Sequence, residues 1–401
     1  MRKKIKLTLF SLLFLFTKFS AQPDTMIVFD LITHKIDTVL PVTFNQSITF
    51  AKTASAVGIL GNQVALSSTP PTSNLFAGSD FSALAKAVSF FNINDYPIRT
   101  AVALRTYSNG ISSRLCSGMM VAPGFVLSAG HCACISGNFK IYDSVQAIPA
   151  YNNGTIPTNI PSSMVKKTYI FKTYYDNTHW DDIALYELKQ PIGIQTGWVG
   201  IGFNSAPNFI TNKVFHKFSY PGAPQPSNPS MVYNGDTLYY NYGYIDETSG
   251  NYSINSSSAE GVPGQSGSSF LYTDNADYYS VGVFNFSTNY IHFKINNAVF
   301  YQLQNIIVNN PLSVKENKNV FNNVNFYPNP FQGQAVLEFE YNPAEHYVIQ
   351  ITDGLGRTVE TINNINNSRV TILQNNLTKG LYFLQLNTKG GYNYNCKIII
   401  N

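Results

Sequence analysis

Residues 264–268 read GQSGS, and two earlier stretches, VLSAGHC at residues 126–132 and DIAL at residues 182–185, precede them. Together they supply, in this order along the chain, a histidine, an aspartate and a serine between glycines. The same three residue types occur in other orders in α/β-hydrolases and subtilisin-like folds. The α/β-hydrolase turn G-x-S-x-G is also missing, because Ser268 stands where its last glycine would be. The order therefore favours a β-barrel architecture.

These side chains have the chemistry that acyl transfer by a serine requires. The hydroxyl of Ser266 is a poor nucleophile at neutral pH and needs a base within hydrogen-bond reach. His131 can act as that base if a carboxylate fixes its tautomer and stabilises its charged form. Asp182 can supply the carboxylate, but Asp181 is adjacent, and strand alternation lets only one of the two face the histidine.

The glycine before the serine also has a predicted role. Because Gly264 has no side chain, its backbone can approach a substrate closely and direct an N–H group at a developing oxyanion. We expect the N–H groups of Gly264 and Ser266 to form an oxyanion hole. In isolation the tetrapeptide would more simply be a turn, so the prediction depends on the two other stretches.

The three stretches resemble the chymotrypsin-fold (trypsin-like) serine proteases. LCSG at residues 115–118, together with VLSAGHC, is similar to that family's histidine region, DIAL to its aspartate strand and GQSG to its serine loop. The resemblance covers residues 91–310 and implies a chymotrypsin-like double β-barrel. It implies a secreted serine endopeptidase that acts through an acyl-enzyme, with Ser266, His131 and Asp182 as the catalytic triad. Asp181 is then expected to be a solvated neighbour.

The resemblance also implies a disulfide between Cys116 and Cys132, which would hold the segment that delivers His131. Cys134 could compete for the same partner. Metal binding by Cys132, Cys134 and a histidine is the rival interpretation, but Cys-x-Cys without a second cysteine pair is not a usual zinc spacing. We expect no metal site, and the triad chemistry needs no cofactor.

Three positions bear on activation and specificity. Gln265 stands where the trypsin branch has an aspartate that pairs with a newly cut N-terminus, so that mode of activation is not expected; an amide there is similar to the glutamyl-endopeptidase branch. Phe284 replaces the histidine on which glutamate selectivity relies in that branch. Glu260 lies six residues before the serine, where an acid at the base of the specificity pocket would favour lysine or arginine; the alternative is a surface glutamate.

The first 21 residues have the pattern of a secretory signal peptide. A basic start, MRKKIK, leads into an apolar run from Leu7 to Phe16 and then to the small residues Ser20-Ala21. The run is too short to cross a membrane, and no later segment has about 20 apolar residues, so no transmembrane segment is expected. We expect cleavage after Ala21 and an oxidising compartment, in which disulfides form.

Composition agrees with a folded, secreted chain. Of 401 residues, 44% are hydrophobic, 12% charged and 14% aromatic, and aromatic side chains suit β-strands. The formal net charge of +4 is misleading, because five basic residues lie in the first 21 positions and their removal leaves −1. A nearly neutral chain has no electrostatic attraction for nucleic acid. The expected partners are protein or peptide substrates.

Organisation along the chain follows from local patterns. Residues 22–90 have no catalytic motif and are either a propeptide or an extension packed on the next domain, with a short helix expected over Phe81–Phe91. Short β-like runs separated by Gly, Pro and Asn turns follow, which predicts an all-β domain. The spacing of apolar residues in Val299–Val308 predicts a helix. Residues 311–320, PLSVKENKNV, are polar and form a linker.

The last segment, residues 321–401, is a separate small β unit. It opens with FYPNPF at residues 326–331, contains the turn DGLG at residues 353–356 and ends with the strands GLYFLQL and KIII. It resembles the type A C-terminal sorting domain of the type IX secretion system of Bacteroidetes. The resemblance implies an immunoglobulin-like sandwich, interaction with the secretion machinery and a final location outside the cell or on the outer-membrane surface. The alternative is a generic β accessory domain.

Two other functions remain open at this stage. The chain could be a non-catalytic surface adhesin or binding protein on a protease-like barrel, although a binding module has no need of a triad. It could also be an esterase that uses the same triad.

Overall fold

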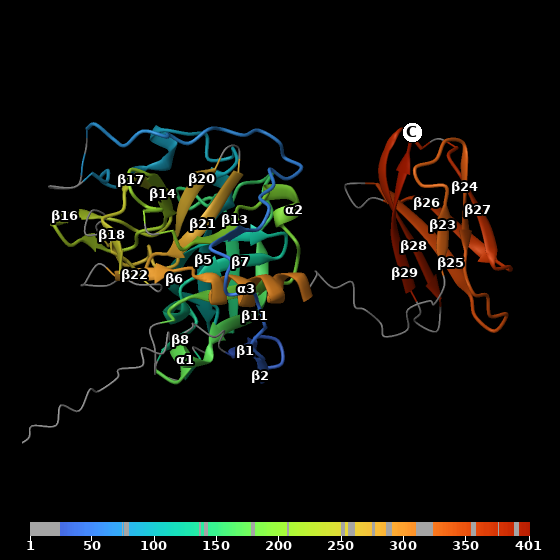
Figure 1. The fold of residues 1–401 in the computed structure, drawn as a ribbon, viewed down its shortest axis with the longest axis horizontal. Helices are drawn as coiled ribbons and strands as arrows, with labels where there is room; N and C mark the ends of the chain where they lie inside the picture. Colours follow the sequence, from blue (N-terminus) through green and yellow to red (C-terminus); the bar gives the residue numbers. More distant parts are fainter. Residues whose placement is uncertain are drawn as a thin grey trace, which may run out of the picture. The chain divides into compact units, whose positions relative to one another are not determined.

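The computed structural model divides into two compact units, residues 1–312 and residues 313–401, which we describe separately (Figure 1). It describes residues 25–73, 75, 80–135, 138–139, 143–177, 181–206, 208–249, 253–255, 261–274, 277–285, 291–309, 324–353, 358–375, 377–388 and 393–401. The predicted signal peptide, the predicted linker and the predicted turn at residues 354–356 lie outside these ranges. Among the described residues, the helices are too short or too polar to cross a bilayer.

Six strands of the first unit close into a barrel. The ring closes because β10 pairs with β5 on one side and with β11 on the other. In ring order the strands are β10 (Ser144–Pro149), β5 (Ala101–Ser108), β6 (Ile111–Ala122), β7 (Phe125–Ser128), β12 (Ala184–Leu188) and β11 (Ser163–Phe171). Every residue of β7 and β12 is buried, which explains why these stretches are mostly apolar without alternation; the buried Glu187 of β12 is bonded to Lys166 and Tyr169.

A second, larger sheet forms the other half of the first unit. Its path is β18 (Glu247–Ser249), β19 (Ser253–Asn255), β22 (Ile291–Lys294), β21 (Asp277–Val283), β20 (Ser269–Asp274), β14 (Val214–Ser219), β17 (Tyr239–Tyr244) and β4 (Ala85–Lys86), and β13 (Gly200–Asn204) pairs with β21 and with β3 (Phe50–Lys52). The helix α3 (Asn297–Asn309) follows it, as predicted, and packs Phe300 against Phe203 of β13. The all-β prediction is confirmed.

Short elements complete the unit. They are the hairpins β8 (Cys134–Ile135) with β9 (Asn138–Phe139) and β15 (Pro224–Gln225) with β16 (Asn228–Val232), the single-turn helices α1 (Lys172–Tyr175) and α2 (Gly193–Thr196), and the 3₁₀ turns at Ala87–Ser89, Ile98–Thr100 and Gly130–Cys132.

The segment before residue 91 contributes strands to both sheets. β1 (Met26–Asp30) pairs with β11 and with β2 (Ile36–Val39), so it extends the first barrel. β3 and β4 pair with strands of the second sheet. The prediction of a helix over Phe81–Phe91 is wrong: Phe81 bridges to Gly243 and only one 3₁₀ turn forms. Pairing with the open edge of β17 outweighs the weak helical spacing of a short segment.

The second unit is a two-sheet sandwich, as the sequence predicts. One sheet has the order β23 (Asn325–Tyr327), β24 (Gln334–Glu338), β27 (Arg369–Leu373), and the other β26 (Thr358–Ile365), β25 (Tyr347–Asp353), β28 (Gly380–Thr388), β29 (Asn393–Ile400). Alternate residues of β24 and β25 are buried in a core that both sheets share. Inward apolar and outward polar residues alternate in this way when two sheets pack face to face.

Candidate active site

Strand pairing brings His131 and Asp182 together. β7 ends at Ser128, which pairs with Ala184 at the start of the antiparallel strand β12, so the residues just beyond these two strand ends meet at one edge of the barrel. The carboxylate Oδ2 of Asp182 lies 2.7 Å from Nδ1 of His131, and Oδ1 accepts the main-chain N–H of His131 at 2.7 Å. Because Nδ1 is engaged in this way, proton exchange with a substrate or a nucleophile would take place at the other ring nitrogen, Nε2.

Asp181 is not the solvated neighbour that the sequence suggests. It is 7% exposed, and its carboxylate accepts a hydrogen bond from the Thr173 hydroxyl of α1. The sequence expectation is therefore wrong about exposure, because the first turn after β11 folds back over this carboxylate. Asp182 is the one of the two whose carboxylate contacts His131.

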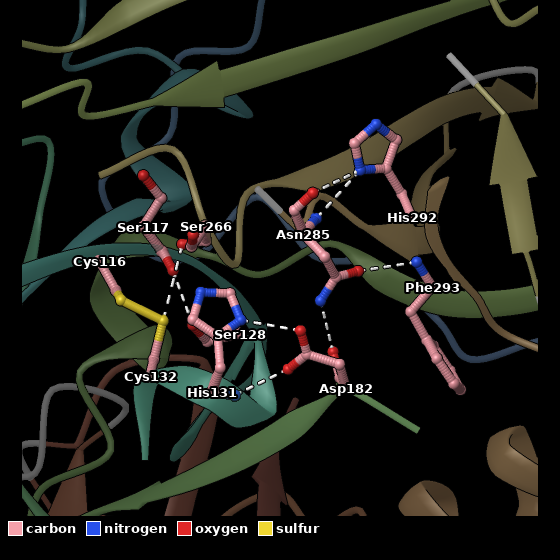
Figure 2. A network of polar contacts seen from close by, with 10 residues as sticks. All are labelled: Cys116, Ser117, Ser128, His131, Cys132, Asp182, Ser266, Asn285, His292 and Phe293. Carbon is pink, nitrogen blue, oxygen red and sulfur yellow. Dashed lines mark hydrogen bonds and ion pairs between the residues drawn. A yellow bond between two sulfur atoms is a disulfide. The ribbon is translucent and has the colours of Figure 1, made fainter. Parts of the chain in front are cut away.

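The loop that carries Ser266 is docked on strand β6 of the first barrel. The N–H of Ser117 donates to the carbonyl of Ser266 at 2.8 Å, and the Ser117 hydroxyl donates to the carbonyl of Gly264 at 2.8 Å. The carbonyl of Ser266 also lies 4.0 Å from Sγ of Cys132, the residue that follows His131. The serine loop is thereby held against the segment that carries the histidine, and Figure 2 shows Ser117, Cys132 and Ser266 together.

Close packing of this loop explains the glycine after the serine. Gly267 has φ +88°, and a Cβ there would lie 2.1 Å from Oγ of Ser128 and 2.2 Å from the carbonyl of Ser117. No side chain fits at either distance. Gly264 is constrained in the same way, with φ +97° and a Cβ position 2.4 Å from the carbonyl of Tyr220. Because neither glycine has a side chain, the loop can pack directly against the main chain of its neighbours.

The main-chain N–H groups of the serine loop differ in whether the described residues supply an acceptor for them. The N–H groups of Val262, Gln265, Gly267 and Ser268 all have protein acceptors, whereas those of Gly264 and Ser266 have none within the described part of the chain.

Peptide geometry directs these two N–H groups away from the loop. The carbonyl of Pro263 is held by the N–H of Gly222 at 2.7 Å, and the carbonyl of Gln265 by the N–H of Ser268 at 3.0 Å. The C=O and N–H of one trans peptide point in opposite directions. The N–H groups of Gly264 and Ser266, which follow these carbonyls, therefore face the other way and can receive an oxyanion.

The side chain of Gln265 is a structural support. It is fully buried, its Nε2 donates to Oγ of Ser219 at 2.9 Å, and its Oε1 accepts the N–H of Val262 at 2.8 Å. All partners are neutral, which suits an amide and leaves no role for a charged group at this position. The expectation that the loop is not ordered by an ion pair with a new N-terminus stays a prediction.

The predicted disulfide is confirmed. Cys116 of β6 and Cys132 are bonded, with their Cα atoms 6.3 Å apart. Cys134 is buried and takes no part in this bond. The bond joins strand β6, which holds the serine loop, to the turn that carries His131. Among the described residues, no group of three or more His, Cys, Asp or Glu side chains could hold a metal ion.

The two predicted specificity residues have different outcomes. Glu260 lies outside the described residues. Phe284 is fully buried behind the serine loop, where its carbonyl accepts the N–H of Gly267 and its N–H donates to Ser268, both at 2.8 Å. Its ring stacks on His292 at 4.1 Å, and Nζ of Lys217 lies 3.5 Å from the ring centroid.

Sequence reasoning missed several residues that hold the site in place. Ser117 lies within a stretch that we singled out, but nothing in the sequence marks its hydroxyl as the partner of Gly264. Asn285 gave no signal, because the carbonyl that its side-chain amide contacts belongs to Asp182, 103 residues earlier in the chain. Such contacts depend on how the two sheets face each other.

Comparison with known proteins agrees with this architecture. Residues 89–303 match the trypsin family, and residues 325–401 match the secretion system C-terminal sorting domain. The glutamyl endopeptidase of Bacillus licheniformis is 30% identical over 134 residues, which are 33% of this chain and 39% of that relative.

Two solved structures are similar in part. A Glu endopeptidase in complex with MPD is 20% identical with a TM-score of 0.44, over 55% of this chain and 94% of that one. The thermostable serine protease AL20, from an extremophilic microorganism, is 16% identical with a TM-score of 0.40, over 51% of this chain and 96% of that one.

The closed first barrel, the second sheet and the histidine–aspartate pair beside a serine loop define a serine protease domain of the two-barrel class. The trypsin match covers more than half of the 401 residues. The chain belongs to the trypsin family, and it carries a C-terminal sorting domain that marks it for secretion through the type IX system to the cell surface or beyond.

Proposed function

We propose that this protein is a secreted serine endopeptidase that cleaves peptide bonds through an acyl-enzyme. Ser266 is the nucleophile, His131 the general base and Asp182 the carboxylate that orients His131. One observation carries the proposal: both carboxylate oxygens of Asp182 bind His131 at 2.7 Å, at the edge of the barrel where strand β6 binds the serine loop.

The chemistry follows from these positions. Oγ of Ser266 attacks the carbonyl carbon of the substrate while Nε2 of His131 takes the hydroxyl proton. The N–H groups of Gly264 and Ser266 bind the oxyanion of the tetrahedral intermediate. His131 then gives the proton to the leaving amine, the C–N bond breaks and the acyl-enzyme remains. Water, deprotonated by His131, releases the acid and restores Ser266.

The two alternatives make different demands on the site. A binding protein has no need for a carboxylate held at two points against a histidine, nor for two N–H groups directed away from their own loop. An esterase would use the same groups, so only its substrates would differ. The hypothesis that Glu260 lies in a specificity pocket and favours lysine or arginine stays a prediction, as does cleavage of the signal peptide after Ala21.

A fluorophosphonate probe tests the proposal, because it reacts covalently with an activated serine. The secreted protein should be labelled and should cleave casein, and Ser266→Ala should lose both activities. Ser268→Ala is the matched control, since its buried hydroxyl lies in the same loop and should not be needed. Casein cleavage that persists in Ser266→Ala would refute the assignment. Labelling and ester hydrolysis without casein cleavage would identify an esterase.

A further inference from the structure

The main chain turns sharply at Asp182. The N–H of Ile183 donates to the carbonyl of Asp181 at 2.8 Å, which closes a three-residue turn with Asp182 at its centre. Strand β12 begins only at Ala184, so the carbonyl of Asp182 lies outside the strand ladder. A buried carbonyl without a ladder partner needs a donor from elsewhere.

Asn285, in the segment that follows β21, supplies that donor. Its Nδ2 donates to the carbonyl of Asp182 at 2.7 Å, and its Oδ1 accepts the N–H of Phe293 in β22 at 2.7 Å (Figure 2). The side chain is 4% exposed, so no water replaces either contact readily. An amide has a donor and an acceptor at its two ends, and both ends are used here.

The main chain of Asn285 is held separately from its side chain. Nδ1 of His292 lies 2.8 Å from the carbonyl of Asn285 and 3.2 Å from its N–H. Burial, together with the charge of Lys217, lowers the pKa of His292 to about 3, so this ring is neutral and stacks on Phe284. A change in the Asn285 side chain therefore leaves the contact between its main chain and His292 in place.

Two consecutive residues thus connect the halves of the site. Phe284 binds the serine loop through its main chain, at Gly267 and Ser268. Asn285 binds the turn that presents the aspartate. This short segment therefore contacts both the nucleophile loop and the Asp182 turn.

We propose that Asn285 is a positioning residue for Asp182, and through Asp182 for His131; this rests on the proposed function of the triad. The two contacts from the carboxylate to His131 fix the ring only while the turn that carries the carboxylate is itself fixed. Loss of the Asn285 amide leaves the Asp182 carbonyl buried without a donor and lets the turn relax. The histidine then loses its fixed tautomer and its alignment with Ser266.

Kinetics of Asn285→Ala in the full secreted chain test this role. Active sites are counted by the end point of fluorophosphonate labelling, so that only folded molecules enter kcat. We expect kcat per site to fall by about tenfold to a hundredfold while KM changes by less than about threefold, because alignment and not substrate binding is lost. Asn285→Ser, whose hydroxyl can serve one of the two partners, should lie between this variant and the wild type and covers the case in which alanine prevents folding.

The matched control is Asn241→Ala. Asn241 is a buried asparagine of β17 whose amide donates to the carbonyl of Ser82, away from the triad. It should lower thermal stability without changing kcat per active site. A purely structural role for Asn285 would give the same result as this control, so an unchanged kcat in Asn285→Ala would overturn the proposal.

A second readout does not depend on catalysis. We expect the proton between Nδ1 of His131 and Asp182, which lie 2.7 Å apart, to be strongly deshielded and to give a separate downfield NMR resonance. This resonance should be lost or broadened in Asn285→Ala and kept in Asn241→Ala. If it persists unchanged in folded Asn285→Ala, the positioning role is refuted. If the wild type shows the resonance but reacts with no probe, the proposed function fails while the test of Asn285 still stands.

Discussion

Replacement of Arg99 by methionine should loosen the segment that precedes the first barrel. The Arg99 side chain is fully buried, and its guanidinium donates five hydrogen bonds to main-chain carbonyls. Four of the acceptors belong to the segment before the barrel. The carbonyls are those of Val57 and Gly61 at 2.6 Å, Asn94 and Thr196 at 2.7 Å and Asn62 at 3.1 Å.

The size of the effect follows from opposing terms. Methionine has a similar length but donates no hydrogen bond, so five carbonyls lose a donor, at about 1–3 kcal/mol for each that stays buried. Against this, the variant no longer buries a cation, and the desolvation cost of several kcal/mol that the guanidinium carries is removed. Burial lowers the pKa of Arg99, a sign of that desolvation cost, although the guanidinium stays charged. We expect a net loss of about 4 kcal/mol.

Thermal unfolding and limited proteolysis measure the result. At about 2–4 °C for each kcal/mol in a unit of this size, the melting temperature should fall by about 10 °C. New proteolytic cuts should appear between residues 57 and 94. Arg105→Met is the matched control, because Arg105 lies on β5 and donates one hydrogen bond, to Oη of Tyr151 at 2.9 Å; it should cost about 1 kcal/mol or less. A change for Arg99→Met no larger than that of the control would refute the reasoning.

Two further predictions concern the serine loop and acid stability. Gly267→Ala should abolish fluorophosphonate labelling, because its Cβ would lie 2.1 Å from Oγ of Ser128. The control Gly110→Ala, at a glycine with φ +74° and open space around it, should leave labelling intact. Equal labelling of the two variants would contradict the packing argument. Burial lowers the pKa of His216 to about 3, below its value of about 6.5 in the unfolded chain, so the stability from its neutral form is complete above pH ~6.5 and is lost as the pH falls toward 3. Urea titrations measure the free energy of unfolding at each pH. Between pH 7 and pH 4 this free energy should fall less steeply for His216→Phe than for the wild type, with a difference in slope of about 1.4 kcal/mol per pH unit for one proton. Identical slopes in the two proteins would count against a buried neutral histidine.

Much of the architecture could be predicted because it depends on local patterns of apolar and turn-forming residues. The apolar run that forms most of β7, the turn residues between short strands and the apolar spacing of α3 each depend on neighbours a few residues away. The cysteine pair and the glycines around Ser266 were also recognisable, since each has a restricted set of structural uses. The resemblance to a known family then supplied the pairing of Cys116 with Cys132, which the structure contains.

Other features could not be predicted from local patterns. The spacing in Phe81–Phe91 suggests a helix, but Phe81 instead bridges to Gly243, some 160 residues later. Asp181 reads as a solvated acid, yet a turn after β11 covers it. Nothing in residues 22–90 showed that β1 and β3 pair with different sheets, and the alternatives of a propeptide and a packed extension stay predictions.

The amino-acid sequence alone indicated that the chain is mostly β, which residues are candidates for the reactive groups and that a glycine is needed at position 264. It could do so because these properties arise from side-chain chemistry and short-range geometry. Only the tertiary structure decided how the reactive groups are held: Asn285 meets the carbonyl of Asp182 across 103 residues, and Ser117 meets Gly264 across 147. Each of these hydrogen bonds ends on a main-chain carbonyl, which every residue possesses, so no residue type marks the acceptor before the two sheets are in place.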